Sequence, residues 1–277
     1  MTEVHQVAAK GFGAEAAAYD RGRPSYPQAA VDWLASMLRI RPSSRVADLA
    51  AGTGKLTELL ASHGCDLVAV EPVEAMRDQL RARLPDTPLV AGVAEAMPFA
   101  PASLDAVTVA QAFHWFNPDQ AMRELARVIR PGGRLGLIWN ARDRGVDWVD
   151  RVWTVMDRVE RHAPWRDHGQ GGPRGAPRWG ERVLAGRPGW SPWTEATFYH
   201  VQRLTHDQVI DRIRSVSHIA ALPPARQGAV LHKIARILHG HPDTRDSTIV
   251  SIGYRVDVRF SERMDHPVAM MRLDGLS

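Results

Sequence analysis

The sequence predicts an α/β fold built on a doubly wound parallel sheet, and three observations lead to this prediction. Residues 45–71 have the pattern of a buried strand, a glycine turn, a helix and a second strand that ends in an acid. Strand-like and helical patterns then alternate as far as residue 140, which is typical of a parallel sheet covered by helices on both faces. Two further strand-like runs, at 194–204 and 249–260, flank a helical stretch.

The first half of the chain supplies most of these elements. Pro27 suits the first turn of a helix, where its missing N–H costs no hydrogen bond. The apolar run Val46–Ala50 ends at a glycine turn and precedes leucines at helical spacing over 55–63. Asn117 followed by Pro118 is typical of a helix start. The other elements are expected as strands over 67–70, 89–91, 104–110 and 134–140 and as helices over 73–84 and 149–159.

Residues 164–193 interrupt this alternation. They hold five prolines, many glycines and tryptophans at positions 165, 179, 190 and 193. The segment is interpreted either as a solvated connection that its tryptophans attach to the surface or as a lid over a substrate. A strand over 194–204 follows, and then two helices within 205–240 that Pro223 and Pro224 separate.

Composition excludes several classes of protein. No apolar run approaches the ~20 residues of a membrane-spanning helix, and the N-terminus lacks the basic and apolar regions of a signal peptide. Cys65 is the single cysteine, which rules out an internal disulfide and favours a cytoplasmic location. The net charge is +4 and the arginines are scattered, so binding to nucleic acid is disfavoured. Oligomeric state is left open by the sequence.

The glycine turn after the first strand indicates an adenosine-type cofactor. Glu71 ends the second strand, 23 residues after Asp48, where a carboxylate accepts hydrogen bonds from both hydroxyls of a ribose. A dinucleotide fingerprint needs a third glycine, but Thr57 occupies that place. Asp48 inside the strand would repel a diphosphate, whereas it suits a cationic ligand. These features favour S-adenosylmethionine over NAD.

The following motifs carry a family resemblance. They are Glu71-Pro72 with Met76, Gly92–Phe99, Leu104–Val109, Gln111–Phe116 and Arg127–Leu135. In this order, with Asp48, Gly52 and Gly54, they resemble the small-molecule branch of the class I S-adenosylmethionine-dependent methyltransferases, closely over residues 12–140. The stretch Tyr19–Pro27 is similar to an N-terminal signature of one bacterial and fungal subgroup. Ala50 departs from the pattern, because many relatives carry glycine there.

The resemblance implies a Rossmann-like sheet of seven strands, mostly parallel, with an antiparallel hairpin at one edge. It also implies that the helical insertion at 205–243 forms a cap over the substrate. We therefore expect three parts: N-terminal helices with the cofactor-binding core over 1–163, a loop and possible lid over 164–193, and completion of the sheet with its cap over 194–277.

The resemblance further implies which residues contact the cofactor. Asp48, Ala50, Gly52 and Gly54 are expected at the methionine half, Glu71 at the ribose, Met76, Ala94 and Glu95 at the adenine, Gln111 at the carboxylate or sulfonium, and Tyr19 and Arg23 as a closure over the cofactor. Three alternatives remain open: Met76 as ordinary helix core, Glu95 as the cap of a following short helix, and the Arg23–Pro27 turn as a purely structural feature.

His114 is the candidate catalytic residue. An imidazole with an ordinary pKa near 6.5 accepts a proton at neutral pH. The alternative is a hydrogen-bonded histidine whose neighbours Trp115 and Phe116 pack into the core. Trp115 and His218 are, with His114, the candidate substrate contacts. His232, His239 and His241 offer too few ligands for a tetrahedral metal site, so no metal is expected.

The function expected from the sequence is transfer of the methyl group of S-adenosylmethionine to a small organic molecule by in-line displacement. Three alternatives remain. One is an NAD-dependent oxidoreductase, and the second is a nucleic-acid methyltransferase, although Ala110–Phe113 stands where base methyltransferases carry an Asn/Asp-Pro-Pro-Tyr/Phe tetrad. The third is a protein that binds S-adenosylmethionine without catalysis or catalyses a methyl-free reaction.

Overall fold

A computed structural model describes residues 22–161 and 187–265. Its seven strands form one sheet in the order β3-β2-β1-β4-β5-β7-β6, parallel from β3 to β5 and antiparallel across β5, β7 and β6. The predicted fold class is therefore confirmed. The strands are β1 (Arg45–Leu49), β2 (Asp66–Val70), β3 (Leu89–Val90), β4 (Leu104–Ala110), β5 (Ile129–Arg142), β6 (Thr194–Thr205) and β7 (Ile249–Glu262).

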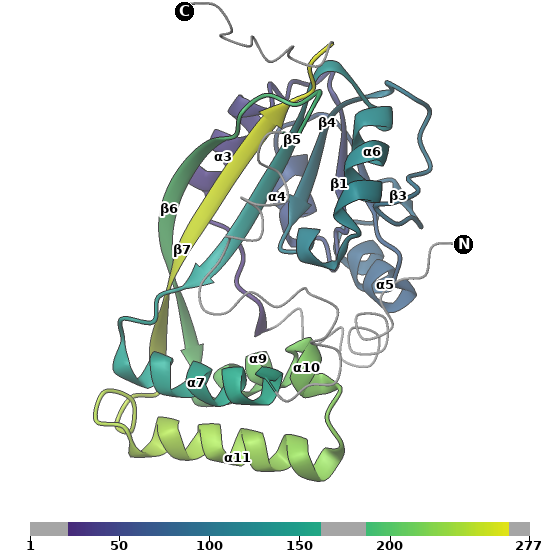
Figure 1. Cartoon of the computed structure of the whole chain (residues 1–277). Helices are drawn as coiled ribbons and strands as arrows, with labels where there is room; N and C mark the ends of the chain where they lie inside the picture. The colour runs from purple at the N-terminus through teal and green to yellow at the C-terminus, as the bar shows by residue number, and fades with distance from the viewer. Residues whose placement is uncertain (1–21, 162–186, 266–277) are drawn as a thin grey trace, which may run out of the picture.

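The helices fall into two groups (Figure 1). Those that accompany the parallel strands are α3 (Gln28–Met37), α4 (Lys55–Ala61), α5 (Glu74–Arg83), the 3-10 turn η1 (Phe113–Trp115) and α6 (Pro118–Val128). The others, at the bottom of Figure 1 beyond the lower ends of β5, β6 and β7, are α7 (Asp147–Arg161), α9 (His206–Arg214), α10 (Ser217–Ala220) and α11 (Pro224–Gly240). None of the helices in the described ranges is long and apolar enough to cross a membrane.

Two element predictions need correction. The strand expected over 134–140 extends to 129–142, because β5 pairs with β7 as far as Arg142 opposite Tyr254. The insertion between β6 and β7 contains three helices rather than two. Pro223 and Pro224 do separate α10 from α11, but α9 ends earlier, where the Ser215 hydroxyl donates to the Arg212 carbonyl at 2.8 Å. A serine that bonds back to the backbone in this way competes with helix continuation.

Successive residues of a strand point to opposite faces of the sheet, and each face packs against its own apolar core layer. Val46 packs with α3 and α4 on one face, whereas Ala47 packs with α6 on the other. A third apolar cluster joins α7, α9 and α11 to the lower end of β7, including the buried side chains Ile252 and Tyr254. The helical insertion is thus attached to the sheet through its own apolar core.

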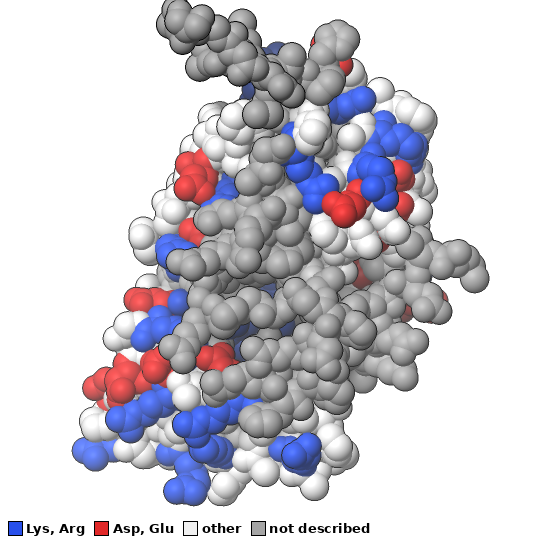
Figure 2. Space-filling view, viewed as in Figure 1, with Lys and Arg blue, Asp and Glu red and all other residues white. Residues whose placement is uncertain are grey.

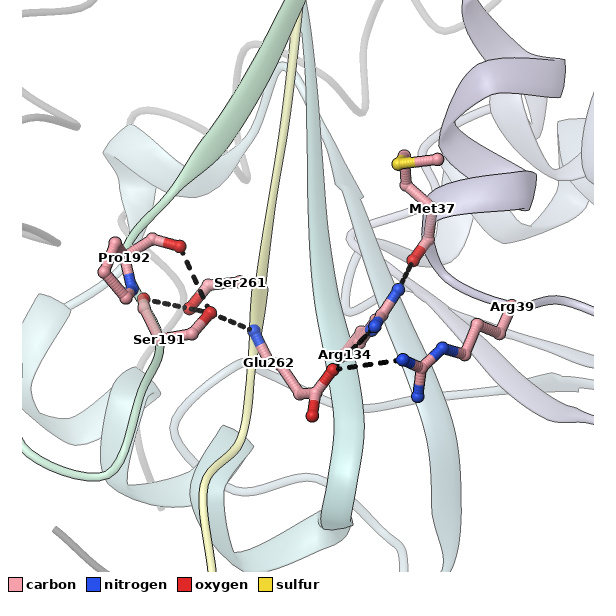
Figure 3. Close-up of polar contacts among 7 residues, drawn as sticks. All are labelled: Met37, Arg39, Arg134, Ser191, Pro192, Ser261 and Glu262. Atoms are coloured by element: carbon pink, nitrogen blue, oxygen red, sulfur yellow. Dashed lines mark hydrogen bonds and ion pairs between the residues drawn. The ribbon is translucent and has the colours of Figure 1, made fainter. Parts of the chain in front are cut away.

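Polar contacts fasten the opposite end of the sheet (Figure 3). Arg134 of β5 donates from Nε and Nη2 to Oε2 of Glu262 on β7, at 2.9 and 2.6 Å, and from Nη1 to the Met37 carbonyl of α3. The Glu262 amide donates to the Ser191 hydroxyl at 2.9 Å. Because this network lies where β5 begins and β7 ends, it leaves the carboxyl ends of the parallel strands free for a binding site.

The visible charges differ between the two parts of the molecule. Figure 2 shows Lys and Arg gathered over the helices at the bottom of the view, with both signs interspersed over the rest of that face. Helix α11 carries the exposed basic residues Arg226, Lys233 and Arg236 and has no acidic residue.

Candidate functional site

The turn after β1 combines left-handed backbone with open space. Ala50, Gly52 and Gly54 have φ angles of 55°, 59° and 86°, in the region that favours glycine. A Cβ added to Gly52 would meet no heavy atom within 4 Å, whereas one added to Gly54 would lie 2.9 Å from Cγ of Leu80. Gly52 therefore borders unfilled space, and Gly54 allows the turn to pack against α5.

Glu71 lies beside this turn. Its side chain accepts backbone hydrogen bonds from Gly52 and Val73, both at 2.9 Å, and the residue is 5% exposed. Burial raises the pKa of the carboxyl group, while the two backbone donors and the charge of Arg77 oppose that shift. The carboxylate thus joins the end of β2 to the glycine turn, and its oxygens retain acceptor capacity beyond these two bonds.

Asp48 lies beneath the turn rather than at its surface. The side chain is fully buried and accepts hydrogen bonds from the hydroxyls of Thr57, at 2.6 Å, and Thr108, at 2.9 Å. Burial raises its pKa to about 6, although both threonines oppose the shift. Each carboxylate oxygen of Asp48 accepts one of these hydrogen bonds, so Asp48 on β1 links Thr57 on α4 to Thr108 on β4. The sequence pattern shows Thr57 only as a replacement for the third glycine and does not reveal that Thr57 and Thr108 both bond to Asp48.

The residues expected at the adenine occupy three different settings. Met76 is buried on α5, and Ala94 is buried in the core beside β2 and β4. The Glu95 carboxylate accepts the backbone N–H of Asn117 at 2.7 Å. Glu95 thus supports the start of α6. It lies in a turn, and no short helix of the kind offered as the alternative follows directly after it.

Gln111 follows β4 in a conformation that is rare for a residue with a side chain. Its φ is 56°. The backbone N–H of Gln111 donates to the Ile138 carbonyl at 3.1 Å, and the side-chain Nε2 donates to the Asn140 carbonyl at 3.4 Å. Together with Ala50, it places left-handed backbone at the carboxyl ends of both central strands. Such conformations gather at functional sites because the surrounding structure must hold them in place.

His114 lies in the turn η1 among aromatic rings. Its ring centroid is 4.7 Å from that of Trp115 and 5.1 Å from that of Trp139 on β5. Nδ1 is buried and has no hydrogen-bond partner among the described residues. Burial, assisted by the charge of Arg23, lowers the pKa of His114 to about 4. The imidazole is therefore neutral at pH 7 and keeps an unused polar atom.

His218 on α10 has a similar environment. Its Nε2 is buried without a hydrogen-bond partner in the described part of the chain. Burial, followed by the charges of Arg142 and Arg23, lowers its pKa to about 4. Because Arg23 acts on both imidazoles, the structure brings Arg23, His114 and His218 into one electrostatic neighbourhood. Tyr19 lies outside the described residues.

Of the 164–193 segment, the structure describes residues 187–193. Trp190 is buried against the core layer that contains α6, and Trp193 packs against the same layer. Trp165 and Trp179 lie outside the described residues, as does most of the segment, which was interpreted either as a solvated connection or as a lid.

Sequence reasoning missed a set of charged and aromatic side chains near His218. Arg142 ends β5, Arg212 lies on α9, and both guanidinium groups face the ring of Trp153 on α7, at 4.8 and 5.8 Å from its centroid. The available signal was the position of Arg142, since charged residues after a central parallel strand lie where α/β sheets bind ligands.

Known proteins resemble this chain along most of its length. The profile of a family described as "Methyltransferase domain" matches residues 47–137. An uncharacterized methyltransferase of Mycobacterium tuberculosis is 39% identical over 246 residues, which cover 88% of this chain and 91% of that protein. A demethylmenaquinone methyltransferase of Beutenbergia cavernae is 44% identical over 99 residues, 35% of this chain and 41% of that protein.

One solved structure adds support for the fold. A proposed type II methyltransferase from Anaeromyxobacter dehalogenans superposes with a TM-score of 0.65 and 27% sequence identity, covering 87% of this chain and 97% of that one. The similarity extends well beyond residues 47–137, the core matched by the family profile.

Proposed function

Because the chain belongs to the class I S-adenosylmethionine-dependent methyltransferases, we propose that its methyl acceptor is a small organic molecule. The observation that carries this proposal is the position of the helical insertion. Its helices lie beyond the lower ends of the long strands, and His218 on α10 shares the charged neighbour Arg23 with His114 of the core. An insertion so near the core suits a confined acceptor site. The relative from Beutenbergia is likewise named for a small-molecule acceptor.

The glycine turn fits the cofactor. S-adenosylmethionine supplies a methyl group on a sulfonium, and transfer breaks that S–C bond as the bond from methyl to acceptor forms. Gly52 leaves open space at the turn, and Glu71 is assigned to the ribose hydroxyls through its remaining acceptor capacity. Asp48 is assigned an indirect part: through Thr57 it positions the turn, and its buried charge favours a cationic ligand.

The other cofactor assignments follow the order of the strands. Ala50, Gly54 and Gln111 are placed at the methionine half because they lie at or beside the carboxyl ends of β1 and β4. Met76 and Ala94 supply apolar surface to the adenine, and the loop held by Glu95 supports its edge. Arg23, with Tyr19, closes over the methionine carboxylate.

His114 is assigned to the reacting atom of the acceptor, with Trp115 and His218 beside it. A neutral imidazole accepts a hydrogen bond and so orients the acceptor, which by itself lowers a reaction barrier substantially. A base with a pKa of about 4 is weak, so His114 removes a proton only from an acceptor that becomes acidic as the new bond forms. Orientation is therefore its main proposed task.

A methyl-transfer screen tests the proposal. Wild-type protein is incubated with methyl-labelled S-adenosylmethionine and a panel of metabolites, and label is expected in a small-molecule product. His114→Ala is expected to lower turnover about a hundredfold, the lower end of the range for a catalytic acid–base residue, with unchanged affinity for S-adenosylhomocysteine. His232→Ala serves as the matched control, because His232 is exposed on α11.

Three outcomes would contradict separate parts of the proposal. Label found in nucleic acid and in no small molecule would contradict the acceptor class. Full turnover by His114→Ala would remove His114 from the site. Tight binding of NAD, with no calorimetric response to S-adenosylhomocysteine, would contradict the cofactor-binding roles given to the glycine turn and Glu71.

A further inference from the structure

A group of basic side chains lies at the carboxyl end of β5, next to the inserted helices. The guanidinium carbon of Arg142 is 4.8 Å from the centroid of the Trp153 ring on α7. That of Arg212 is 5.8 Å from the same ring and 5.6 Å from the centroid of Tyr254 on β7. Two guanidinium groups from different elements therefore share one aromatic ring, whose face attracts cations.

Among the described residues, the basic side chains that act electrostatically on Arg142 and His218 outnumber the acidic ones. Arg23 is a third guanidinium, and its charge acts on both Arg142 and His218. Asp157 is the acid that also acts on both, but its Oδ2 already accepts a hydrogen bond from Arg144 at 2.7 Å. Like charges repel more strongly where water is scarce. An anion bound among these side chains would relieve that repulsion.

Arg142 is the member best placed to meet a ligand. Within the described ranges, its guanidinium forms no ion pair or hydrogen bond. Part of the residue reaches solvent, while the neighbouring elements remove water from around its charged group. Desolvation, followed by the charge of Arg212, lowers its pKa to about 9, so the group is still charged at pH 7. Arg212, by contrast, is 3% exposed and donates to the Gly22 carbonyl at 3.3 Å. The N–H fork of an accessible guanidinium matches the oxygens of carboxylates and phosphates.

This group adjoins the proposed reaction site. The Gln111 side chain, at the end of β4, donates to the carbonyl of Asn140, two residues before Arg142. Trp139, on the same strand, has its ring 5.1 Å from that of His114. The last residues of β5 thus connect the candidate cofactor and acceptor contacts to Arg142.

We propose that Arg142, flanked by Arg212 and Arg23, binds an anionic group of the methyl acceptor, either a carboxylate or a phosphate monoester. The inference rests on the proposed function, because it names the class of acceptor that the same site selects. Arg142 is a positioning residue in this arrangement: it holds the end of the acceptor that does not react, while His114 contacts the reacting atom.

The test measures cofactor and anion binding separately. Calorimetry first compares the affinity for S-adenosylhomocysteine of wild-type protein, Arg142→Met and Arg142→Lys, and equal values are expected. With S-adenosylhomocysteine saturating, tryptophan fluorescence then follows titrations with glutarate, inorganic phosphate and the neutral analogue glutaramide. Wild type is expected to bind one of the anions and not glutaramide. Arg142→Met should weaken that binding about tenfold, the loss expected of one charge-assisted contact, and Arg142→Lys should retain part of it.

The matched control is Arg226→Met, which removes an exposed arginine from α11 and should leave anion binding unchanged. Binding of glutarate without phosphate would support a carboxylate-bearing acceptor, and the reverse a phosphate-bearing one. The inference is overturned if wild type binds neither anion, if Arg142→Met binds the anion as tightly as wild type, or if Arg142→Met loses affinity for S-adenosylhomocysteine, since the guanidinium would then serve the cofactor. A wild type that does not bind S-adenosylhomocysteine contradicts the proposed function instead.

Discussion

Gly52 and Gly54 share a left-handed backbone conformation but differ in what surrounds them. Open space lies beside Gly52, whereas Leu80 lies against Gly54. Both positions require the freedom of glycine, yet the ligand argument applies to Gly52 alone. The difference permits a test that separates binding from folding within one turn.

Gly52→Ala is expected to fold, with a loss of about 1–2 kcal/mol in unfolding free energy from left-handed backbone, and to weaken binding of S-adenosylhomocysteine strongly. Gly54→Ala should lose about 1–3 kcal/mol more, because its Cβ overlaps Leu80. Urea denaturation and calorimetry measure the two quantities. Gly52→Ala with unchanged affinity would show that the open space beside the turn is not cofactor space.

At this scale the sequence predicts features formed by residues that are close along the chain. It does not predict contacts between residues that only the fold brings together. The glycine turn and Glu71 were identified because strand, turn and acid follow one another closely along the chain. The bond from Thr108 to Asp48 spans 60 residues, and no spacing rule predicts it. Arg142 and Arg212 converge on Trp153 from three separate elements, so their grouping depends on how α7 and α9 pack against β5 and β7.

At the scale of elements, the starts of helices were the easiest features to predict, because neighbouring residues mark them. The prediction that Asn117 begins α6 is confirmed, since its side chain accepts the Gln120 amide at 3.1 Å. The full length of β5 was not predictable, because its last residues are strand through pairing with β7, which lies more than 100 residues further along the chain. The start of α9 shows a comparable signal, a capping box between Thr205 and Gln208.

Thr205→Ala is expected to lower the unfolding free energy by about 1 kcal/mol, the usual cost of a lost N-cap. The variant removes the acceptor of the Gln208 amide at the junction of β6 and α9, the helix that carries Arg212. Urea denaturation measures the loss. Thr194→Ala, at the exposed start of β6, is the control and should change stability by less than about 0.5 kcal/mol. Equal losses in both variants would show that the capping box does not stabilise the junction.

At the scale of the whole molecule, the order of strands and the place of the insertion were both accessible from the sequence. Alternating patterns require a covered parallel sheet, and the family resemblance supplied the antiparallel edge. The burial of ionisable groups was not accessible, because it depends on how elements that are distant in the sequence pack against one another. Asp48 is buried within the core with a raised pKa, whereas His114 and His218 are surrounded by protein with lowered pKa values.

These groups give the stability a pH dependence with a definite sign. Between about pH 4 and 6, the unfolded chain binds protons on both histidines and not on Asp48, while the folded chain binds a proton on Asp48 and on neither histidine. From these groups the unfolded state therefore holds one more proton. Stability rises with pH through this window, by at most about 1.4 kcal/mol per pH unit. The two histidines destabilise the folded state progressively as pH falls from 6.5 toward 4, because only the unfolded chain binds their protons. Asp48 acts in the opposite direction: it stabilises the folded state as pH falls through about 6, because only the folded chain binds its proton.

Two variants isolate the opposing contributions. Asp48→Asn removes the opposing group, so its stability should rise more steeply between pH 4 and 6 than that of wild type, by up to about 1.4 kcal/mol per unit. His218→Gln removes one favourable group and should flatten the curve by a similar amount. Urea denaturation at several pH values gives the three slopes, and all other titrating groups cancel in the comparison because the proteins share them. Parallel curves for the three proteins would mean that Asp48 and His218 titrate in the folded protein as they do in the unfolded chain, and that folding desolvates neither group.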